Sequence, residues 1–437
     1  MTPLNGIHFP SSGRACPAHW PSADGWSPPR AGQARPLNGL RINHLAGVFS
    51  LVTLLTFAAL PAHAQPQPAV PVDGPAFVAE LVAADAKWQL TLSTGQGPRV
   101  LPAAELVRWG TCAECVRGPV VVLADGGLLV ADVLGSEKER LKVDSDLFGL
   151  LELPLGQLAG VVFDPPAQHL RRDLLLDRLA RATGESDQLL LSNGDELTGL
   201  IEALEGDRVR LGTNDGPVAI ERSRIAAVVF NPLLRREPVR QGLRAWVGLA
   251  DGSRLIATGL LMDGSSLQLT TAGGQTCKTA SKEIVCLRPL GARVTYLSDL
   301  KPADYQQQPF LGLRWPSYGT DRNVTGGRLR CGGRLYLKGL GVHSFTRLTY
   351  RLTDPYKRFE AELGIDDSTA GGGSVRFEVR VDGRQKYVSQ TTVRGGMPPV
   401  AVRVDLDGAK QLELIVDYAD RADELDHADW LDARLVR

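Results

Sequence analysis

A motif of two short apolar strands joined by an Asp-Gly or Asn-Gly turn occurs three times in this chain. It constrains the fold more than any other feature. The copies lie at 120–135, 189–204 and 247–262. Asn-Gly and Asp-Gly allow the positive φ values of a two-residue hairpin turn. Two copies end in nearly the same sequence, AGVVFDP at 159–165 and AAVVFNP at 226–232. The third ends in IVCLRP at 284–289. Such internal repetition predicts an array of similar small β units.

Alternating apolar residues over short stretches leave each sheet one buried face, which favours small, strongly bent sheets. With a weaker copy at the start, we expect four β repeats, at 76–118, 119–166, 187–232 and 246–290. The turn pattern loosely resembles small Sm-like or SH3-like barrels. A helix is expected over 168–183, with Leu170, Leu174, Leu175 and Leu179 on one face, inside a linker at 167–186. A second linker is expected at 233–245.

The N-terminal residues read as a targeting segment. A weakly polar to apolar run over 45–60 is preceded by Arg35 and Arg41 and ends in Pro61-Ala62-His63-Ala64, an A-x-A cleavage pattern. Residues 1–64 are therefore expected to be a long leader with a secretory signal peptide, cleaved after Ala64, followed by a Pro/Gln-rich spacer at 65–75. A retained membrane span would need about 20 apolar residues. We expect export to the periplasm or the extracellular space, with no stable membrane span after cleavage.

Composition and motifs exclude several functions. The 437 residues include 49 basic and 49 acidic side chains, so the formal net charge is zero and nucleic acid is not an expected partner. The chain contains no GxSxG, no HExxH and no Gly-rich phosphate loop. The Asp and Asn residues of the repeat turns are explained by turn geometry. These absences favour a protein that is not an enzyme and needs no cofactor, apart from a structural calcium ion considered below.

Export would place the cysteines in an oxidising compartment. Cys277 and Cys286 flank an expected turn, so we predict a disulfide between them. Cys112 and Cys115 form a lone CxxC, for which a zinc site would require a second pair of ligands nearby. A local Cys112–Cys115 disulfide is the favoured interpretation. Cys331 would remain an unpaired, buried thiol.

The character of the chain changes at about residue 294, where six sequence blocks appear in order. They are YLSDL at 296–300, YLKGLGVH at 336–343, LTYRL at 348–352, FEAELGIDD at 359–367, SVRFEVRVDG at 374–383 and DHADW at 426–430. These blocks resemble the NPCBM family, the novel putative carbohydrate-binding modules. Ser344 stands where the family more often has Ala, and Cys331 replaces a usual aliphatic residue. The resemblance implies a galactose-binding-like β-sandwich (jelly roll) over 292–437, and the strand-length apolar patterns there agree with it. The expected fold class is all-β.

The resemblance implies sugar binding, for which aromatic faces and planar or charged hydrogen-bonding groups are needed. The candidate residues are Trp315, Tyr318, Arg322, Asn323, His343, Asp426, His427, Asp429 and Trp430. His343 could contact the sugar or hold a loop from the core. Trp430 could be a stacking platform or a core residue. Asp366 and Asp367 are weak candidates for a structural calcium ion.

Three functions follow from this organisation. The first is an exported, non-catalytic carbohydrate-binding protein whose β repeats act as a spacer or a docking platform for a protein partner. The second is an accessory subunit or a cryptic member of a glycoside hydrolase system, which would need two carboxylates in a cleft. The third is an envelope protein–protein scaffold whose sandwich no longer binds sugar. Binding of a glycan by residues 290–437 separates the first function from the third.

Overall fold

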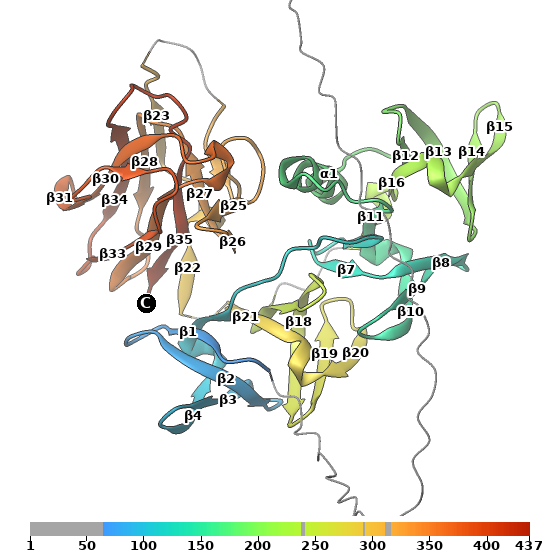
Figure 1. Cartoon of the computed structure of the whole chain (residues 1–437), viewed down its shortest axis with the longest axis horizontal. Coiled ribbons are helices and arrows are strands. Elements are labelled where there is room, and N and C mark those ends of the chain that lie inside the picture. Colours follow the sequence, from blue (N-terminus) through green and yellow to red (C-terminus); the bar gives the residue numbers. More distant parts are fainter. Residues whose placement is uncertain (1–63, 237–240, 292, 311–315) are drawn as a thin grey trace, which may run out of the picture. The chain divides into compact units, whose positions relative to one another are not determined.

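The computed structural model describes residues 64–236, 241–291, 293–310 and 316–437, so the predicted signal peptide lies outside the described residues apart from Ala64. Within this part, the chain forms β-strands, short 3-10 turns and one α-helix (Figure 1). The predicted all-β fold class is confirmed. No helix among the described residues is long and apolar enough to cross a membrane.

Four sets of strands share one order, in which the last strand pairs with the first. The first set consists of β1 (Gln67–Pro71), β2 (Phe77–Ala84), β3 (Gln89–Thr94), β4 (Gly97–Pro102) and β5 (Leu106–Gly110). β1 pairs with both β2 and β5, β2 pairs with β3, and β3 pairs with β4, all antiparallel. A 3-10 turn at Ala103–Glu105 precedes the last strand.

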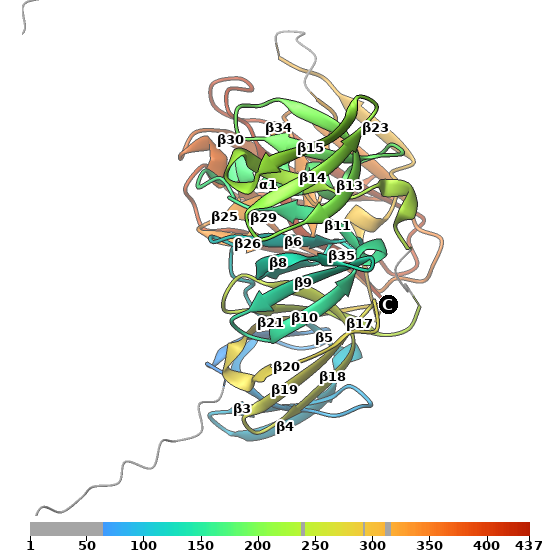
Figure 2. The ribbon, with the colours of Figure 1, turned by 90° about the vertical axis from the view of Figure 1, so that its right-hand side faces the viewer.

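The same order recurs along the chain. The second set is β6 (Val120–Leu123), β7 (Leu128–Val130), β8 (Asp132–Glu137), β9 (Arg140–Ser145), β10 (Gly149–Pro154) and β11 (Leu158–Val162). Here the long second strand is split, and β8, β9 and β10 form a small sheet (Figure 2). The third set is β12 (Asp187–Leu191), β13 (Glu196–Leu204), β14 (Arg208–Thr213), β15 (Gly216–Glu221) and β16 (Ile225–Val229). The fourth set is β17 (Arg244–Leu249), β18 (Arg254–Asp263), β19 (Ser266–Thr271), β20 (Thr276–Ala280) and β21 (Ile284–Leu290).

The predicted spacer at 65–75 is wrong, because it contains β1 and the turn of the first repeat. Asp73 to Leu106, Asp125 to Leu158 and Asp251 to Ile284 each span 33 positions from the turn to the last strand. Prolines at both ends of β1 gave this segment the composition of a spacer. Proline lacks an N–H donor, yet Ala69 and Val70 between them still pair with β5.

The four repeats associate through their last strands. β5 pairs with β21, and β11 pairs with β16, so the first repeat lies beside the fourth and the second beside the third (Figure 1). Gly110 (φ +73°) allows this approach, because a Cβ there would lie 2.0 Å from the Val285 carbonyl oxygen. All residues of β5 and β11 are buried. These apolar strands therefore form the seams of the array.

Both predicted disulfides are wrong, and the strand pairing explains why. Cys112 is bonded to Cys286, across 174 positions of sequence, with a Cα–Cα distance of 4.9 Å. Gly110 lies directly opposite Cys286 in the β5–β21 pair, so the residues that follow β5 reach Cys286 on β21. Cys115, Cys277 and Cys331 are buried free thiols. Proximity in sequence misled the prediction, since the nearest partner in space comes from another repeat.

The helix α1 (His169–Arg181) follows the second repeat, as expected, but it buries a different face. Leu176 and Leu179 pack against strands of the second and third repeats, whereas Leu174 is 44% exposed. Arg172 and Asp173 are also buried. The helix therefore has two covered sides, one apolar against the repeats and one charged against the C-terminal region.

The C-terminal region is a β-sandwich with one core. One sheet contains β22 (Val294–Tyr296), β24 (Gly319–Thr320), β27 (Gly339–Val342), β29 (Arg358–Ile365), β33 (Val400–Asp405) and β35 (Ala428–Val436). The other contains β23 (Asp304–Gln307), β28 (Thr346–Arg351), β30 (Ser374–Val381), β31 (Arg384–Val388), β32 (Val393–Arg394) and β34 (Gln411–Tyr418). β25 (Leu329–Cys331) and β26 (Arg334–Tyr336) form a hairpin. Side chains of both sheets share one apolar cluster, which includes Phe359, Phe377 and Trp430.

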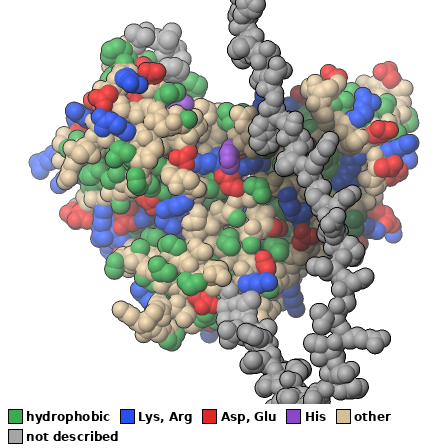
Figure 3. Space-filling model, viewed as in Figure 1, with side chains coloured by type: hydrophobic (Ala, Val, Ile, Leu, Met, Phe, Trp, Pro, Cys, Tyr) green, Lys and Arg blue, Asp and Glu red, His purple; other side chains and the backbone are tan. Residues whose placement is uncertain are grey.

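Ion pairs join the sandwich to the repeats. Arg288 on β21 donates two hydrogen bonds to Asp432 on β35, at 2.7 and 3.0 Å, and both side chains are buried. Arg330 on β25 binds Glu114 at 2.6 and 3.0 Å and Asp173 on α1 at 2.6 Å. Elsewhere on the face shown in Figure 3, basic and acidic side chains are interspersed, as expected from the zero net charge.

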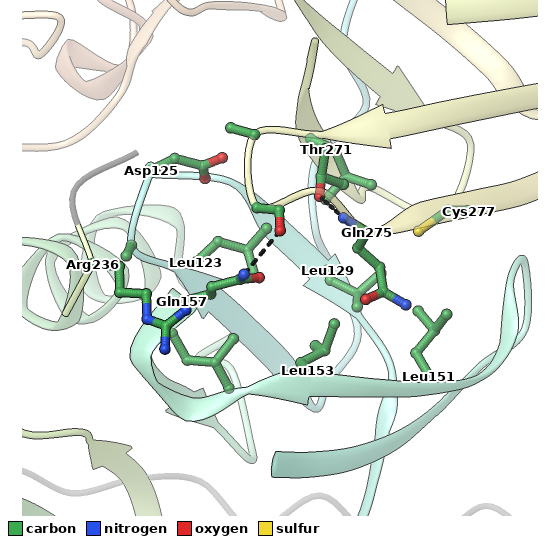
Figure 4. Close-up of a pocket in the computed structure, with 15 residues that line it drawn as sticks. Leu123, Asp125, Leu129, Leu151, Leu153, Gln157, Arg236, Thr271, Gln275 and Cys277 are labelled. Atoms are coloured by element: carbon green, nitrogen blue, oxygen red, sulfur yellow. Dashed lines mark hydrogen bonds between the residues drawn. The ribbon is translucent and has the colours of Figure 1, made fainter. Parts of the chain in front are cut away.

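An apolar cavity of about 170 Å³ lies between the second and fourth repeats (Figure 4). Leu129, Leu151 and Leu153 are among its lining residues, together with the thiol of Cys277. The Gln157 amide crosses to the fourth repeat and donates to the Gly273 carbonyl oxygen at 2.9 Å. The cavity is therefore a gap in the packing of two repeats, and the contact from Gln157 crosses it.

Candidate functional site

Three connecting segments of the sandwich emerge at one end. β27 ends at Val342, which pairs with Ala428, the first residue of β35, and Ala428 pairs with Ile365 at the end of β29. Segments 343–345, 366–373 and 419–427 therefore lie together, whereas Val294 and Val436 pair at the opposite end of β35. The end formed by these three segments is called the loop end below. It carries His343, Asp426 and His427 of the predicted set.

His343 and His427 meet at the loop end. Their ring centroids are 5.4 Å apart with the rings perpendicular, and His343 is 6% exposed. Burial, followed by the neighbouring His427, lowers the pKa of His343 to about 4. Burial also lowers the pKa of His427. Both imidazoles are therefore neutral at pH 7, and a neutral imidazole offers one donor and one acceptor nitrogen to a hydroxyl group.

Asp426 holds the loop end together from inside. It is fully buried, it accepts a hydrogen bond from Ser374 N at 2.8 Å, and the Ser344 hydroxyl donates to its other oxygen. Burial raises the pKa of Asp426 to about 6, against the opposing effect of these hydrogen bonds. Ser344 and Ser374 were not predicted to matter. Asp426 binds them across 82 and 52 positions of sequence, a proximity that the sequence does not show.

Asp429 and Asn323 also have buried, structural positions. Burial, and then the charge of Asp366, raises the pKa of Asp429 well above its usual value. Asn323 donates to Asp366 at 2.8 Å and accepts from Gly327 N at 2.9 Å. These contacts fix the connection that leads into β25. Neither side chain is open to a ligand.

Trp430 lies in the sandwich core with no exposed surface. Its ring packs edge-on against Phe377 at 5.0 Å and against Phe359 at 6.1 Å between centroids. The stacking-platform hypothesis does not fit this position, and the core alternative does. Buried tryptophans of this kind contribute mainly to stability.

The predicted site residues that precede β25 do not lie together in one site. Trp315 lies outside the described residues. Tyr318 is partly buried and packs against Tyr305 at 5.2 Å between ring centroids. Arg322 forms an ion pair with Asp177 of α1. Arg322 therefore joins the sandwich to the helix, and its role in sugar binding stays a prediction.

An aromatic pair that the sequence analysis missed lies at the loop end. Phe310 is 58% exposed, and its ring meets Tyr418 edge-on at 5.6 Å. The Phe310 amide donates to Asp423, and the Tyr418 hydroxyl donates to the Gln308 carbonyl oxygen. The available signal was the position of Tyr418, the last residue of a predicted strand at the same end as His343.

Asp366 and Asp367 already accept hydrogen bonds from N–H groups. Asp366 accepts from Arg330 N at 2.9 Å and Ser368 N at 2.9 Å, and Asp367 accepts from the amides of Gly332 and Gly333. In the described part of the chain, no group of three or more His, Cys, Asp or Glu side chains could hold a metal ion. The geometry therefore gives the calcium hypothesis no support, and it stays a prediction that calcium titration would test.

His343 and Asp426 are expected to give opposite pH dependences of stability. The folded-state pKa of His343 is about 4, below its ordinary value of 6.5, so its contribution is complete above pH 6.5 and is lost as the pH falls toward 4. The pKa of Asp426 is about 6, above its ordinary 3.8, so its contribution is complete below pH 3.8 and is lost as the pH rises toward 6. The pKa shift of each side chain changes the free energy of unfolding by roughly 3 kcal/mol across its pH range.

We therefore expect the free energy of unfolding of Asp426→Asn to rise between pH 4 and 6.5, and that of His343→Gln to fall between pH 4 and 6. The wild-type profile should be flatter than either, because the two contributions offset each other. Urea unfolding at a series of pH values, followed by near-ultraviolet circular dichroism, measures this. Parallel profiles for the three proteins would contradict the assignment.

Comparison with known proteins identifies the C-terminal region. Residues 293–436 match the model of the NPCBM/NEW2 domain. Residues 293–436 are an NPCBM domain. A stretch of 116 residues is 34% identical to Alpha-1,3-galactosidase B of Akkermansia muciniphila, and it covers 26% of this chain and 14% of that protein. The chain spans 14% and 7% of the length of the two curated relatives it matches.

Solved structures with similarity to the chain include two from Clostridium perfringens. CBM51 of GH95 in complex with methyl-galactose is 26% identical, covering 33% of this chain and 99% of that one, with a TM-score of 0.30. The CBM51-2 and INT domains of ZmpB in complex with GlcNAc are 28% identical, covering 41% of this chain and 38% of that one, with a TM-score of 0.31. The match to the NPCBM domain thus covers the C-terminal third, and the four repeats lie upstream of it.

Proposed function

We propose that this protein is an exported, non-catalytic glycan-binding protein, in which the loop end of the NPCBM domain binds the sugar and the β repeats serve as a spacer or docking platform. The observation that carries the proposal is the aromatic pair of the exposed Phe310 and the half-buried Tyr418, at the same end as the neutral His343 and His427. An aromatic face covers the apolar side of a sugar ring, and neutral imidazoles suit uncharged hydroxyls. The NPCBM family membership of this region supports the same function.

α-Linked galactosides are the first ligands to test. The support is the 34% identity of a 116-residue stretch of this chain to a protein named Alpha-1,3-galactosidase B. Sugar recognition that relies on hydroxyl hydrogen bonds discriminates strongly against analogues that lack the hydroxyl. A galactoside should therefore bind in preference to its 4-deoxy analogue.

A non-catalytic role is favoured by the state of the carboxylates at the loop end. Glycoside hydrolysis needs two carboxyl groups that face the scissile bond across a cleft. Asp426 and Asp429 are fully buried, and Asp366 is engaged by N–H donors. Of the less buried carboxylates in segment 419–427, Asp423 accepts from the Phe310 amide, Asp420 pairs with Arg394, and Glu424 is exposed. A chromogenic glycoside panel hydrolysed by the full chain would instead favour the accessory or cryptic glycosidase alternative.

Phe310→Ala is expected to weaken galactoside binding by roughly tenfold or more, taking as a guide the about 1–3 kcal/mol that stacking of a nucleobase on an aromatic side chain contributes. Phe310 is exposed, so the substitution should leave the fold intact. Isothermal titration of the full chain with α-galactosides measures the effect. Tyr387→Ala, which removes a partly buried aromatic ring on β31, is the matched control.

The outcomes separate the hypotheses. Equal affinity of Phe310→Ala and the wild-type protein would show that the sugar site lies elsewhere on the domain. If no glycan binds and no glycoside is hydrolysed, the envelope scaffold alternative gains support. Export is tested separately, by fusing residues 1–64 to a reporter enzyme that is active only in the periplasm.

A further inference from the structure

A second cleft, of about 450 Å³, lies where the second and fourth repeats meet the first strand of the NPCBM domain. Its size is within the range of small-molecule sites. Its lining combines two aromatic rings with four charged side chains: Trp246, Tyr296, Asp125, Arg244, Asp299 and Lys338. This composition is unlike the apolar cavity of Figure 4, which shares Asp125 with it.

The strands of the fourth repeat place two of these side chains on one face. Arg244 and Trp246 are two positions apart on β17, so both point to the same side of the sheet. Arg288 lies opposite Trp246 on β21, and it is bound to Asp432 and to the Tyr296 hydroxyl at 3.0 Å. The NPCBM domain thus covers this face of the fourth repeat at Arg288. The cleft lies over the part of the same face that carries Arg244 and Trp246.

The charged side chains of the cleft differ in whether they have hydrogen-bond and ion-pair partners. Lys338 binds Asp299 at 2.6 Å and Asp321 at 2.8 Å, so this wall is internally paired. Among the described residues, the half-buried Arg244 acts on Asp125 through its charge, and its Nε is a buried donor with no hydrogen-bond partner. A buried donor without a partner costs about 1–3 kcal/mol. A ligand that accepts a hydrogen bond from Arg244 would recover that cost.

Asp125 faces Arg244 from the turn of the second repeat. Its Oδ1 accepts from Gly127 N at 2.8 Å, which leaves Oδ2 for a ligand. The corresponding side chains Asn193 and Asp251 accept the same turn hydrogen bond in the third and fourth repeats. Asp125 differs from them in lining this cleft. In Figure 4 it lies at the edge of the apolar cavity, on the side away from Leu151.

The charges of the lining balance, with Asp125 and Asp299 against Arg244 and Lys338. Lys338 is already occupied by Asp299 and Asp321. A neutral ligand with several hydroxyls can accept a hydrogen bond from Arg244 and donate one to Asp125. The Trp246 ring supplies an apolar surface beside these two groups. We propose that this cleft is a second carbohydrate site, which binds an uncharged sugar between Trp246, Arg244 and Asp125.

Fluorine NMR of the full chain labelled with 5-fluorotryptophan tests the proposal, because Trp246 reports on this cleft alone. Its resonance is assigned with Trp246→Phe. Lactose, N-acetylglucosamine and N-acetylgalactosamine are the neutral probes, and glucuronate is the charged probe. At least one neutral sugar should shift the Trp246 resonance saturably, and Arg244→Gln and Asp125→Asn should each weaken this response by roughly tenfold or more.

The controls separate this site from the loop end. Asp251→Asn changes the equivalent turn of the fourth repeat and should leave the Trp246 response unchanged. Phe310→Ala should also leave it unchanged, so failure of the loop-end proposal does not affect this test. Asp125→Asn keeps the turn, since Asn193 occupies that position in the third repeat. The proposal is overturned if no neutral sugar shifts Trp246, if only glucuronate does, or if Arg244→Gln and Asp125→Asn respond like the wild type.

Discussion

Replacing both Cys112 and Cys286 by alanine should lower the free energy of unfolding by about 5 kcal/mol. The disulfide closes a loop of 174 residues, and chain-entropy models assign about 5 kcal/mol to a loop of that length. It also joins the first and fourth repeats where β5 meets β21. Urea unfolding with and without dithiothreitol measures the effect, since reductant should lower the midpoint of the wild type but not that of the double variant.

Cys277→Ala is the matched control, because Cys277 is a buried thiol with no disulfide. It should retain the full response to reductant. Burial raises the pKa values of the Cys115 and Cys277 thiols to about 11. Thiolates are therefore scarce at neutral pH, and exchange with the Cys112–Cys286 bond should be slow. A wild-type midpoint that does not respond to reductant would contradict the assigned contribution.

Asp432→Asn should cost about 3–5 kcal/mol, because it leaves the buried Arg288 without a counter-charge. Asp432 is fully buried, binds Arg288 through both oxygens, and lies 3.5 Å from Arg108 Nε. Asparagine keeps the size of the side chain, so the substitution isolates the charge. Denaturant unfolding, together with limited proteolysis at the junction of the repeats and the NPCBM domain, measures it.

The pH dependence of this pair has a definite sign. Burial alone would raise the pKa of Asp432, but the charges of Arg288, Arg108 and Arg434 outweigh it and hold the pKa below 3.8. Its contribution is therefore present above about pH 4 and is lost as the pH falls further. Asp420→Asn is the control, because Asp420 pairs with Arg394 at the surface and should cost less than about 1 kcal/mol. Equal losses for the two variants would rule out the buried pair as a major contributor.

Local signals in the sequence predicted the fold class well. The Asp125, Asn193 and Asp251 turns identify three repeats because a hairpin turn depends on two adjacent residues. The NPCBM blocks predicted the sandwich for a similar reason, since each block is one strand with its turn. The first repeat was only partly seen, because the prolines around β1 resemble a linker, although Asp73-Gly74 marks its turn as clearly as the others.

Features that depend on long-range register could not be predicted. The Cys112–Cys286 bond requires knowledge that β5 pairs with β21, which nothing near either cysteine indicates. The candidate site shows the same limit. The residues next to Trp430 and His343 do not show that one ring lies in the core and the other at the loop end. Arg322 looked available for a ligand because its partner, Asp177, is 145 positions away.

The pairing of β5 with β21 has a consequence for the order of synthesis. When the first repeat leaves the ribosome, its partner strand β21 has not been synthesised, because it lies some 175 positions further along the chain. An uncovered apolar edge strand invites pairing with other chains. Fragments that stop before residue 284 should therefore aggregate, whereas chains that continue through β21 should not. A nascent chain kept unfolded until its fourth repeat is complete would avoid this hazard.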